Sequence, residues 1–239
     1  MSVDVSRRGF VKACSAFAAL TAAPSGRLAQ PVFALEGAPR LRLVDKTGEP
    51  IKTRALEEHA NYIFLYPHVS TPCLLLRLGS ATPRDVQRKD AQNAPYTWPG
   101  GVGIDGAVVA YSAICAHALS YNSRRTSFLT YREVPSHLSG RDPVITCCGH
   151  ASVYGPAEGA NVLSGPSEFP LAAVQLKYHA DTDELTAVGL IGTALIDNFF
   201  KAFRADLNAE FGRGGYRALV DGQTTVLPIE EYSEAVVHC

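Results

Sequence analysis

Short apolar, β-branched runs separated by turn residues recur along most of the chain up to residue 190. They lie at residues 41–44, 62–66, 73–78, 108–114 and 171–178. The sequence Asp181-Thr182-Asp183 predicts a hairpin turn between strands at 175–179 and 184–188. The Pro- and Gly-rich residues 95–106 predict a loop. Short strands and turns at this spacing predict an all-β fold, an antiparallel β-sandwich of small sheets.

The pattern changes after Gly189. Apolar residues then recur at spacings of three and four, which predicts an amphipathic helix that the glycines from Gly212 onward end. A strand-like run at 217–220 and a Thr- and Val-rich segment at 224–227 follow. The Phe-rich face of this helix either packs on the chain's own domain or docks on a larger partner subunit. The residues of this face are Leu195, Ile196, Phe199, Phe200, Phe203, Leu207 and Phe211.

Composition allows either one good-sized domain or a domain plus an appendage. The chain has 239 residues, 46% of them hydrophobic, and a formal net charge of −1. Lys and Arg are dispersed, so nucleic acid is not an expected partner.

The N-terminus matches an export signal. Residues 6–12 read S-R-R-G-F-V-K, close to the twin-arginine pattern, and an Ala-rich stretch follows them. We therefore expect residues 1–30 to be a signal and the protein to be periplasmic. The uncharged stretch 13–26 is shorter than the about 20 apolar residues of a membrane span, which favours cleavage. Retention as a membrane anchor is the alternative.

The candidate chemistry lies in two short boxes. Cys115 and His117 form a C-x-H box, and Cys147 and His150 form a C-x-x-H box. Two Cys and two His suit a [2Fe–2S] centre with two thiolates on one iron and two imidazoles on the other. The same set also suits structural zinc, although zinc modules usually space paired ligands by two to four residues.

The flanking residues favour the iron–sulfur alternative. Ser152 and Tyr154 follow the second box as H-x-S-x-Y, and residues 165–171 read G-P-S-E-F-P-L. With these motifs, residues 74–189 resemble the Rieske iron–sulfur protein family. The resemblance implies Cys115 and Cys147 on the buried iron, and His117 and His150 on the outer iron.

The resemblance also implies an organisation and two hydrogen-bond donors. It predicts a Rieske domain at 31–190, with a cluster subdomain inserted at about 112–170, and a C-terminal extension at 191–239. Ser152 is expected to donate to a cluster sulfur and Tyr154 to a cysteine Sγ. Both donors would favour the reduced cluster and raise its potential.

The chain departs from the family pattern in its cysteines and its spacing. Respiratory relatives join the two boxes by a disulfide, but the second-box partner would fall at Gly149, and the first box has no Cys between His117 and Ser120. Residues 126–143 look like a surface insertion. Cys239 could pair with Cys148 or with another chain, so no specific disulfide is predicted.

These observations predict an exported electron-transfer subunit that is not catalytic alone. The expected partners are a larger redox subunit, either a molybdenum oxidase or a cytochrome, and a c-type cytochrome or quinol. Similarity leans toward the small subunit of arsenite oxidase, and the alternative is the iron–sulfur subunit of a quinol–cytochrome c oxidoreductase. A cytoplasmic Rieske ferredoxin conflicts with the export signal. A zinc-binding structural module is the alternative from a different class.

Overall fold

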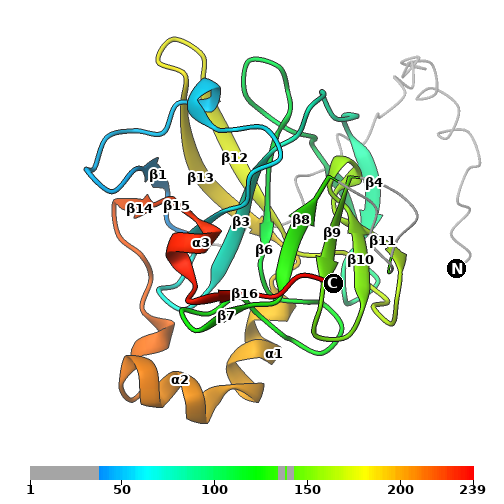
Figure 1. Cartoon of the computed structure of the whole chain (residues 1–239), viewed down its shortest axis with the longest axis vertical. Coiled ribbons are helices and arrows are strands. Elements are labelled where there is room, and N and C mark those ends of the chain that lie inside the picture. Colours follow the sequence, from blue (N-terminus) through cyan, green and yellow to red (C-terminus); the bar gives the residue numbers. More distant parts are fainter. Residues whose placement is uncertain (1–37, 134–137, 139–142) are drawn as a thin grey trace, which may run out of the picture. The chain divides into compact units, whose positions relative to one another are not determined.

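Strands dominate the computed structural model, which describes residues 38–133, 138 and 143–239 (Figure 1). The expected signal at 1–30 lies outside these residues. The largest sheet has eight strands in the order β14-β1-β13-β12-β6-β3-β2-β15. Their bounds are β1 Leu41–Val44, β2 Tyr62–Leu65, β3 Pro72–Arg77, β6 Val108–Ser112, β12 Ala173–His179, β13 Glu184–Ile191, β14 Gln223–Thr225 and β15 Leu227–Pro228.

The large sheet curls so that its two outer strands are neighbours in sequence. β14 pairs in parallel with β1, and β15 pairs antiparallel with β2 at the other end of the strand order. Thr224 of β14 also exchanges hydrogen bonds with Leu65 of β2, its hydroxyl accepting from the amide at 3.2 Å and donating to the carbonyl at 2.9 Å. The C-terminal extension therefore closes the sheet.

A second sheet has four strands in the order β11-β10-β9-β8. These strands are β8 Leu129–Arg132, β9 Val144–Cys147, β10 Ser152–Gly155 and β11 Asn161–Ser164. The other strand pairs are β4 Val86–Lys89 with β5 Pro95–Trp98, and β7 Thr126–Ser127 with β16 Ala235–Val236. The fold of the described residues is all-β, as the strand pattern predicted, with a small helical extension.

Two hydrophobic clusters lie on opposite faces of the large sheet. Along β3, Cys73 and Leu75 belong to one cluster, and Leu74 and Leu76 to the other, as the alternation of side chains in a strand requires. The first cluster includes the apolar residues of the C-terminal helices. The second joins the large sheet to β8, β9 and β10, and contains Cys115, Cys147 and Tyr154.

The predicted helix is two helices, α1 Ala194–Ala202 and α2 Arg204–Phe211. The chain bends at Phe203, whose φ of −103° and ψ of 19° leave the helical region and whose ring packs against Tyr121 and Phe199. Gly212 follows with a φ of +77° and ends α2 as predicted. Phe199 and Phe200 are buried against the large sheet, so the Phe-rich face packs on the chain's own domain. The remaining helix, α3, spans Ile229–Tyr232.

Three expectations about local structure were wrong. Residues 95–106 are not all loop, because 95–98 form β5, which buries Tyr96 and Trp98. Residues 126–143 are not simply a surface insertion, because β7 and β8 lie within them and β8 pairs with β9. The run at 217–220 is not a strand. Its first residue belongs to the 3-10 turn Gly215–Arg217, and the run pairs only through a single bridge between Leu219 and His68. Other 3-10 turns span Thr53–Ala55 and Pro156–Glu158.

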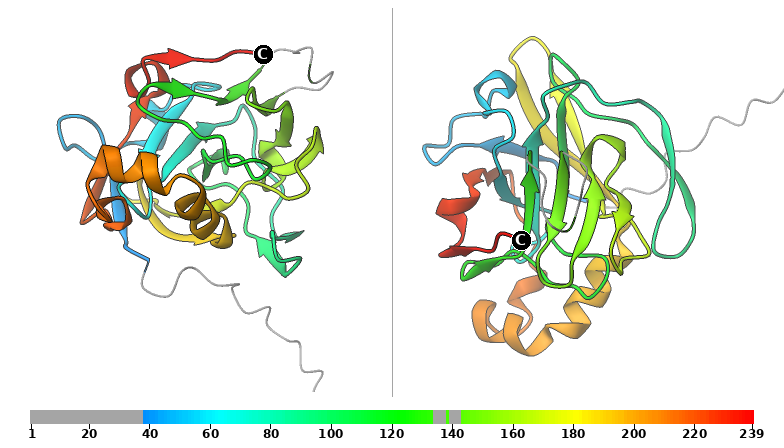
Figure 2. Two further views of the ribbon diagram at one scale, coloured as in Figure 1. Left: turned by 90° about the horizontal axis from the view of Figure 1, so that it is seen from below. Right: turned by 45° about the vertical axis from the view of Figure 1, so that its right-hand side comes forward.

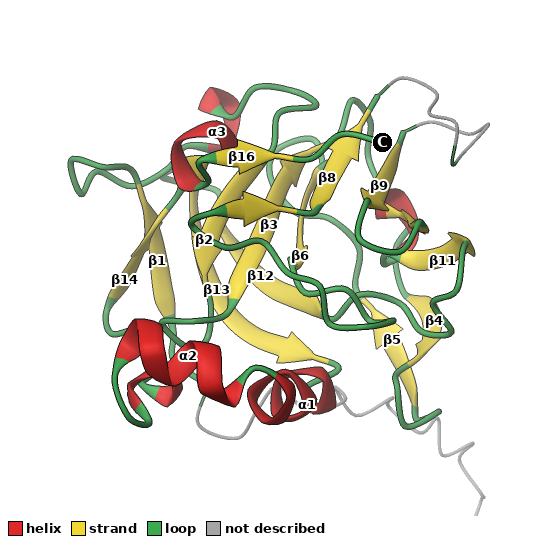
Figure 3. Cartoon of the chain, turned by 60° about the horizontal axis from the view of Figure 1, so that its bottom comes forward, coloured by secondary structure: helices red, strands yellow, loops and turns green. Residues whose placement is uncertain are grey.

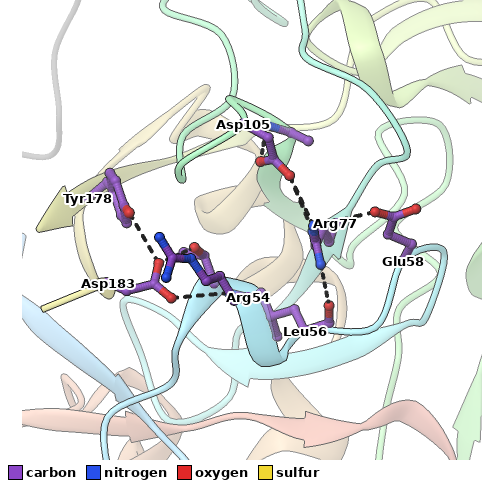
Figure 4. A network of polar contacts seen from close by, with 9 residues as sticks. Arg54, Leu56, Glu58, Arg77, Asp105, Tyr178 and Asp183 are labelled. Atoms are coloured by element: carbon purple, nitrogen blue, oxygen red, sulfur yellow. Dashed lines mark hydrogen bonds and ion pairs between the residues drawn. The ribbon is translucent and has the colours of Figure 1, made fainter. Parts of the chain in front are cut away.

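A polar network links loops at one end of the large sheet (Figure 4). Arg77, at the end of β3, makes ion pairs with Asp105 at 3.2 Å and Glu58 at 3.4 Å. Asp183 of the β12–β13 turn accepts hydrogen bonds from the Arg54 amide and the Tyr178 hydroxyl. Figure 1 and the right-hand view of Figure 2 place this turn at the opposite end from α1 and α2.

No helix among the described residues is long and apolar enough to cross a membrane.

Candidate metal centre

The first box lies in a tight turn directly after β6, at the end of the sheet that carries the helices. The Cys115 amide donates to the Ser120 carbonyl at 2.8 Å, and the Leu119 amide donates back to Cys115 at 3.1 Å. Tyr121, next along the chain, packs edge-on against Phe199 of α1. Cys115 is fully buried and His117 is exposed.

The second box forms the turn between β9 and β10. Cys147 is the last residue of β9 and pairs with Ser152, the first residue of β10. The Ala151 amide closes the turn by donating to the Cys147 carbonyl at 2.9 Å. Cys147 is buried and His150 is exposed, so both boxes place their Cys inward and their His outward.

The two boxes lie side by side, with the two Cys side chains in one buried cluster and the two His rings in contact at the surface. The Cys115 and Cys147 side chains are both buried in the second hydrophobic cluster, and each shifts the pKa of the other. The imidazole rings of His117 and His150 lie edge to face with centroids 5.2 Å apart. Within the described part of the chain, no three Cys, His, Asp or Glu side chains form a group that could hold one metal ion. The arrangement is therefore a buried pair of thiols and an exposed pair of imidazoles.

The two thiols have pKa values shifted in opposite directions. Interaction with the Cys147 side chain lowers the pKa of Cys115, and the same interaction raises the pKa of Cys147. Backbone N–H groups of His117 and Ala118 act on Cys115, and each of them favours the thiolate. Backbone groups of the second turn act on Cys147 in the same sense. Main-chain donors of both turns thus favour negative charge on the sulfurs.

Ser152 and Tyr154 lie beside the thiols on β10. The Tyr154 hydroxyl is 3.2 Å from Cys115 Sγ, and burial is the main cause of its raised pKa. Ser152 is fully buried, and its hydroxyl has no hydrogen-bond partner among the residues that the structure describes. A buried hydroxyl without a partner costs about 1–3 kcal/mol, and an acceptor bound beside it would remove that cost.

The segment 165–171 packs directly on the second box. Gly165 has a φ of +88°, and a Cβ there would lie 2.2 Å from the Ala151 carbonyl oxygen and 2.7 Å from Ser152 Cα. Only glycine allows this approach. Phe169 and Pro170 then line a cavity of about 220 Å³, together with His117 and with Leu195 of α1.

Two features of the site were not predicted from the sequence. Asn122 is fully buried and ties the first-box loop to β8, because Oδ1 accepts from the Phe128 and Leu129 amides and Nδ2 donates to the Leu129 carbonyl. Cys148, between the two second-box ligand candidates, forms a disulfide with Cys239. From the sequence alone this pairing is one of two alternatives, because a sequence does not give the distance between two cysteines.

No family model matches the chain. It is similar to the crystal structure of the soluble domain of the Rieske protein II (soxF) from Sulfolobus acidocaldarius. The identity is 26%, the match covers 66% of this chain and 80% of that one, and the TM-score is 0.47.

Proposed function

We propose that this chain is an electron-transfer protein that holds a Rieske-type [2Fe–2S] cluster with Cys115, His117, Cys147 and His150. The observation that carries the proposal is the pairing of the side chains by type, with the thiols together in the core and the imidazoles together at the surface. A cluster with two thiolates on one iron and two imidazoles on the other needs this division.

The neighbouring residues fit the same group. The buried Ser152 hydroxyl lacks a partner in the described structure and would gain an acceptor in a cluster sulfur. The Tyr154 hydroxyl already lies 3.2 Å from Cys115 Sγ. When bound, such a cluster supplies one-electron redox chemistry at a potential raised by its neutral imidazole ligands.

The chain's own residues would shield the sulfur side of the cluster from water and present its histidine side to a partner. The second hydrophobic cluster surrounds Cys115 and Cys147 and keeps water away from the sulfur side. The exposed imidazoles of His117 and His150 are available to a donor or an acceptor. A neutral imidazole has one acceptor nitrogen, which would bind the iron, and one N–H donor, so this edge can hydrogen-bond a quinol or lie against a haem protein.

At a finer level, we propose that the chain is the exported subunit of a periplasmic or membrane-associated oxidoreductase complex, similar to the small subunit of arsenite oxidase. The twin-arginine pattern at residues 6–12 supports export. The iron–sulfur subunit of a quinol–cytochrome c oxidoreductase is the alternative, and it predicts a retained N-terminal anchor. Intact mass of the protein isolated from its host distinguishes the two, because a cleaved chain starts near residue 30.

Electron paramagnetic resonance of the dithionite-reduced full chain tests the cluster. We expect a rhombic signal with the low average g value of mixed His and Cys ligation, and no such signal from His150→Ala. Exposed His238, in the C-terminal segment, gives the matched control His238→Ala, which should retain the signal. A silent wild-type sample with stoichiometric zinc would reject the electron-transfer proposal and favour a structural metal site.

A further inference from the structure

The C-terminal strap, residues 233–239, lies along the segment before β8 and ends beside the second box. In Figures 1 and 3 the C-terminus lies next to β8 and β9. The Ser127 and Ser233 hydroxyls are hydrogen-bonded at 2.7 Å, and the Val237 amide donates to the Ser127 carbonyl at 2.9 Å. Cys239 then forms its disulfide with Cys148. The last residue of the strap is therefore covalently bonded to the turn that carries the second box.

Cys148 is held from two directions. On one side its amide donates to the Phe128 carbonyl at 2.8 Å. On the other side its Sγ is bonded to Cys239 and lies 3.5 Å from the Val237 carbonyl oxygen. The Arg132 guanidinium also donates to the Cys239 main-chain oxygen, which fixes the end of the strap to β8. The residue that follows Cys147 is thus fixed by the main chain and by a covalent bond.

The two box loops are not joined covalently to one another. Ser120 and Gly149 face each other where the loops meet, and a Cβ on Gly149 would lie 3.1 Å from Ser120 Cβ. On their exposed side the loops meet through the edge-to-face rings of His117 and His150 and through Ser120 Oγ and His150 Nδ1, which are 3.4 Å apart. Neither contact is strong enough to hold an exposed turn to the few tenths of an ångström that a metal ligand set requires.

We propose that the Cys148–Cys239 disulfide is a positioning element that fixes the turn presenting Cys147 and His150, in place of a covalent link between the box loops. The inference rests on the proposed function, because it assumes that these two residues are cluster ligands. The disulfide lies between them in sequence, so any movement of Cys148 changes the geometry of both. The strap supplies an anchor because its Ala235 and Val236 pair with Thr126 and Ser127 of β7.

The test is the variant Cys148→Ser/Cys239→Ser in the full chain, which removes the disulfide without leaving a free thiol beside Cys147. Three quantities are compared with wild type and with His238→Ala, an exposed substitution in the same strap. They are the rate of cluster loss to an iron chelator, the midpoint potential, and the width of the paramagnetic resonance signal. We expect cluster loss to be about tenfold faster, as for other residues that orient metal ligands. We also expect a shifted potential and a broader signal.

A second disulfide, introduced directly between the two box loops, distinguishes a role in positioning the second-box turn from a role in overall stability. Ser120→Cys/Gly149→Cys, added to the double variant, introduces sulfurs at the facing loop positions, where small shifts bring the Cβ atoms to disulfide distance. This bridge leaves the strap untethered. It should nevertheless restore slow cluster loss and a narrow signal, because it fixes the same turn.

Each remaining outcome decides against one of the two proposals. Wild-type rates, potential and signal width in the double variant would overturn the positioning role. Failure of the double variant to fold, without rescue by the second disulfide, would also overturn it and assign the disulfide to the stability of the strap. A wild-type chain without the mixed-ligation signal would reject the proposed function itself, and this is measured before any variant.

Discussion

Tyr154 shows how a single hydroxyl can tune the candidate centre. It is fully buried, and its oxygen lies 3.2 Å from Cys115 Sγ, so it has no access to water as an alternative partner. Donation to a sulfur favours the form with more negative charge. For Tyr154→Phe we expect a lower midpoint potential and an unchanged cluster spectrum. A preference of about 1 kcal/mol for the reduced state corresponds to roughly 40 mV for a one-electron couple.

The matched control for this substitution is Tyr111→Phe. Tyr111 is buried in the same hydrophobic cluster, but its hydroxyl donates to the Pro156 carbonyl at 2.6 Å and not to a sulfur. Redox titration of both variants should therefore show a shift for Tyr154→Phe alone. Equal potentials in both variants would mean that the hydroxyl of Tyr154 does not act on the cluster.

Gly165 sets the distance between the segment 165–171 and the second box. A methyl group there would overlap the Ala151 carbonyl oxygen, and the positive φ adds a backbone cost. We expect Gly165→Ala to lower stability by about 1–3 kcal/mol and to reduce the iron content of the purified protein. Gly222→Ala, at a φ of +65° with nothing within 4 Å, carries the backbone cost without the overlap. Equal iron content in the two variants would contradict the packing role.

At the scale of elements, α1 is held by aromatic packing. Phe199 is fully buried and contacts Tyr121, which follows the first box, so the helix supports the loop that carries His117. Phe199→Ala should lower the free energy of unfolding by about 3–5 kcal/mol, measured by chemical denaturation. Asn198→Ala, an exposed position on the same helix, should change it little. Similar values for both would mean that the helix does not belong to the cooperative core.

The elements that were predicted correctly are those whose apolar pattern is local. The strands at 41–44, 62–65 and 72–77 are short apolar runs with mostly buried residues, and the turn at 181–183 joins the strands on either side of it. β5 and β8 were missed because their stability comes from partners. Tyr96 and Trp98 of β5 are buried in the second hydrophobic cluster, among residues distant in sequence, and β8 is recognisable only through its pairing with β9.

At the scale of the whole molecule, the segment after Gly192 is part of the fold. It contributes β14 to the edge at β1, β15 to the edge at β2, and β16 to β7. A chain ending at residue 192 would expose the edges of the large sheet and the core face that α1 covers. We expect this truncated chain to be insoluble and to show no cooperative thermal transition. A soluble truncated chain with the wild-type cluster spectrum would show instead that the extension is dispensable.

The candidate site was largely predictable from the sequence because its chemistry lies in short motifs. The four ligand candidates, with Ser152 and Tyr154, lie together in the structure; their role as cluster residues stays a prediction. Asn122 and the Cys148–Cys239 disulfide were not predictable. Asn122 acts through main-chain atoms of Phe128 and Leu129, which carry no sequence signal.

The sequence determined the all-β class, the two boxes and the change to a helical pattern after Gly189, because each depends on the residue types and periodicity of a short stretch. Tertiary structure decided which partners these stretches find. It placed the thiols inward and the imidazoles outward, bent the helix at Phe203, and closed the large sheet with the extension. It also brought Cys239 to Cys148 across a separation of 91 residues. A contact over that distance depends on the path of the whole chain, which no local pattern encodes.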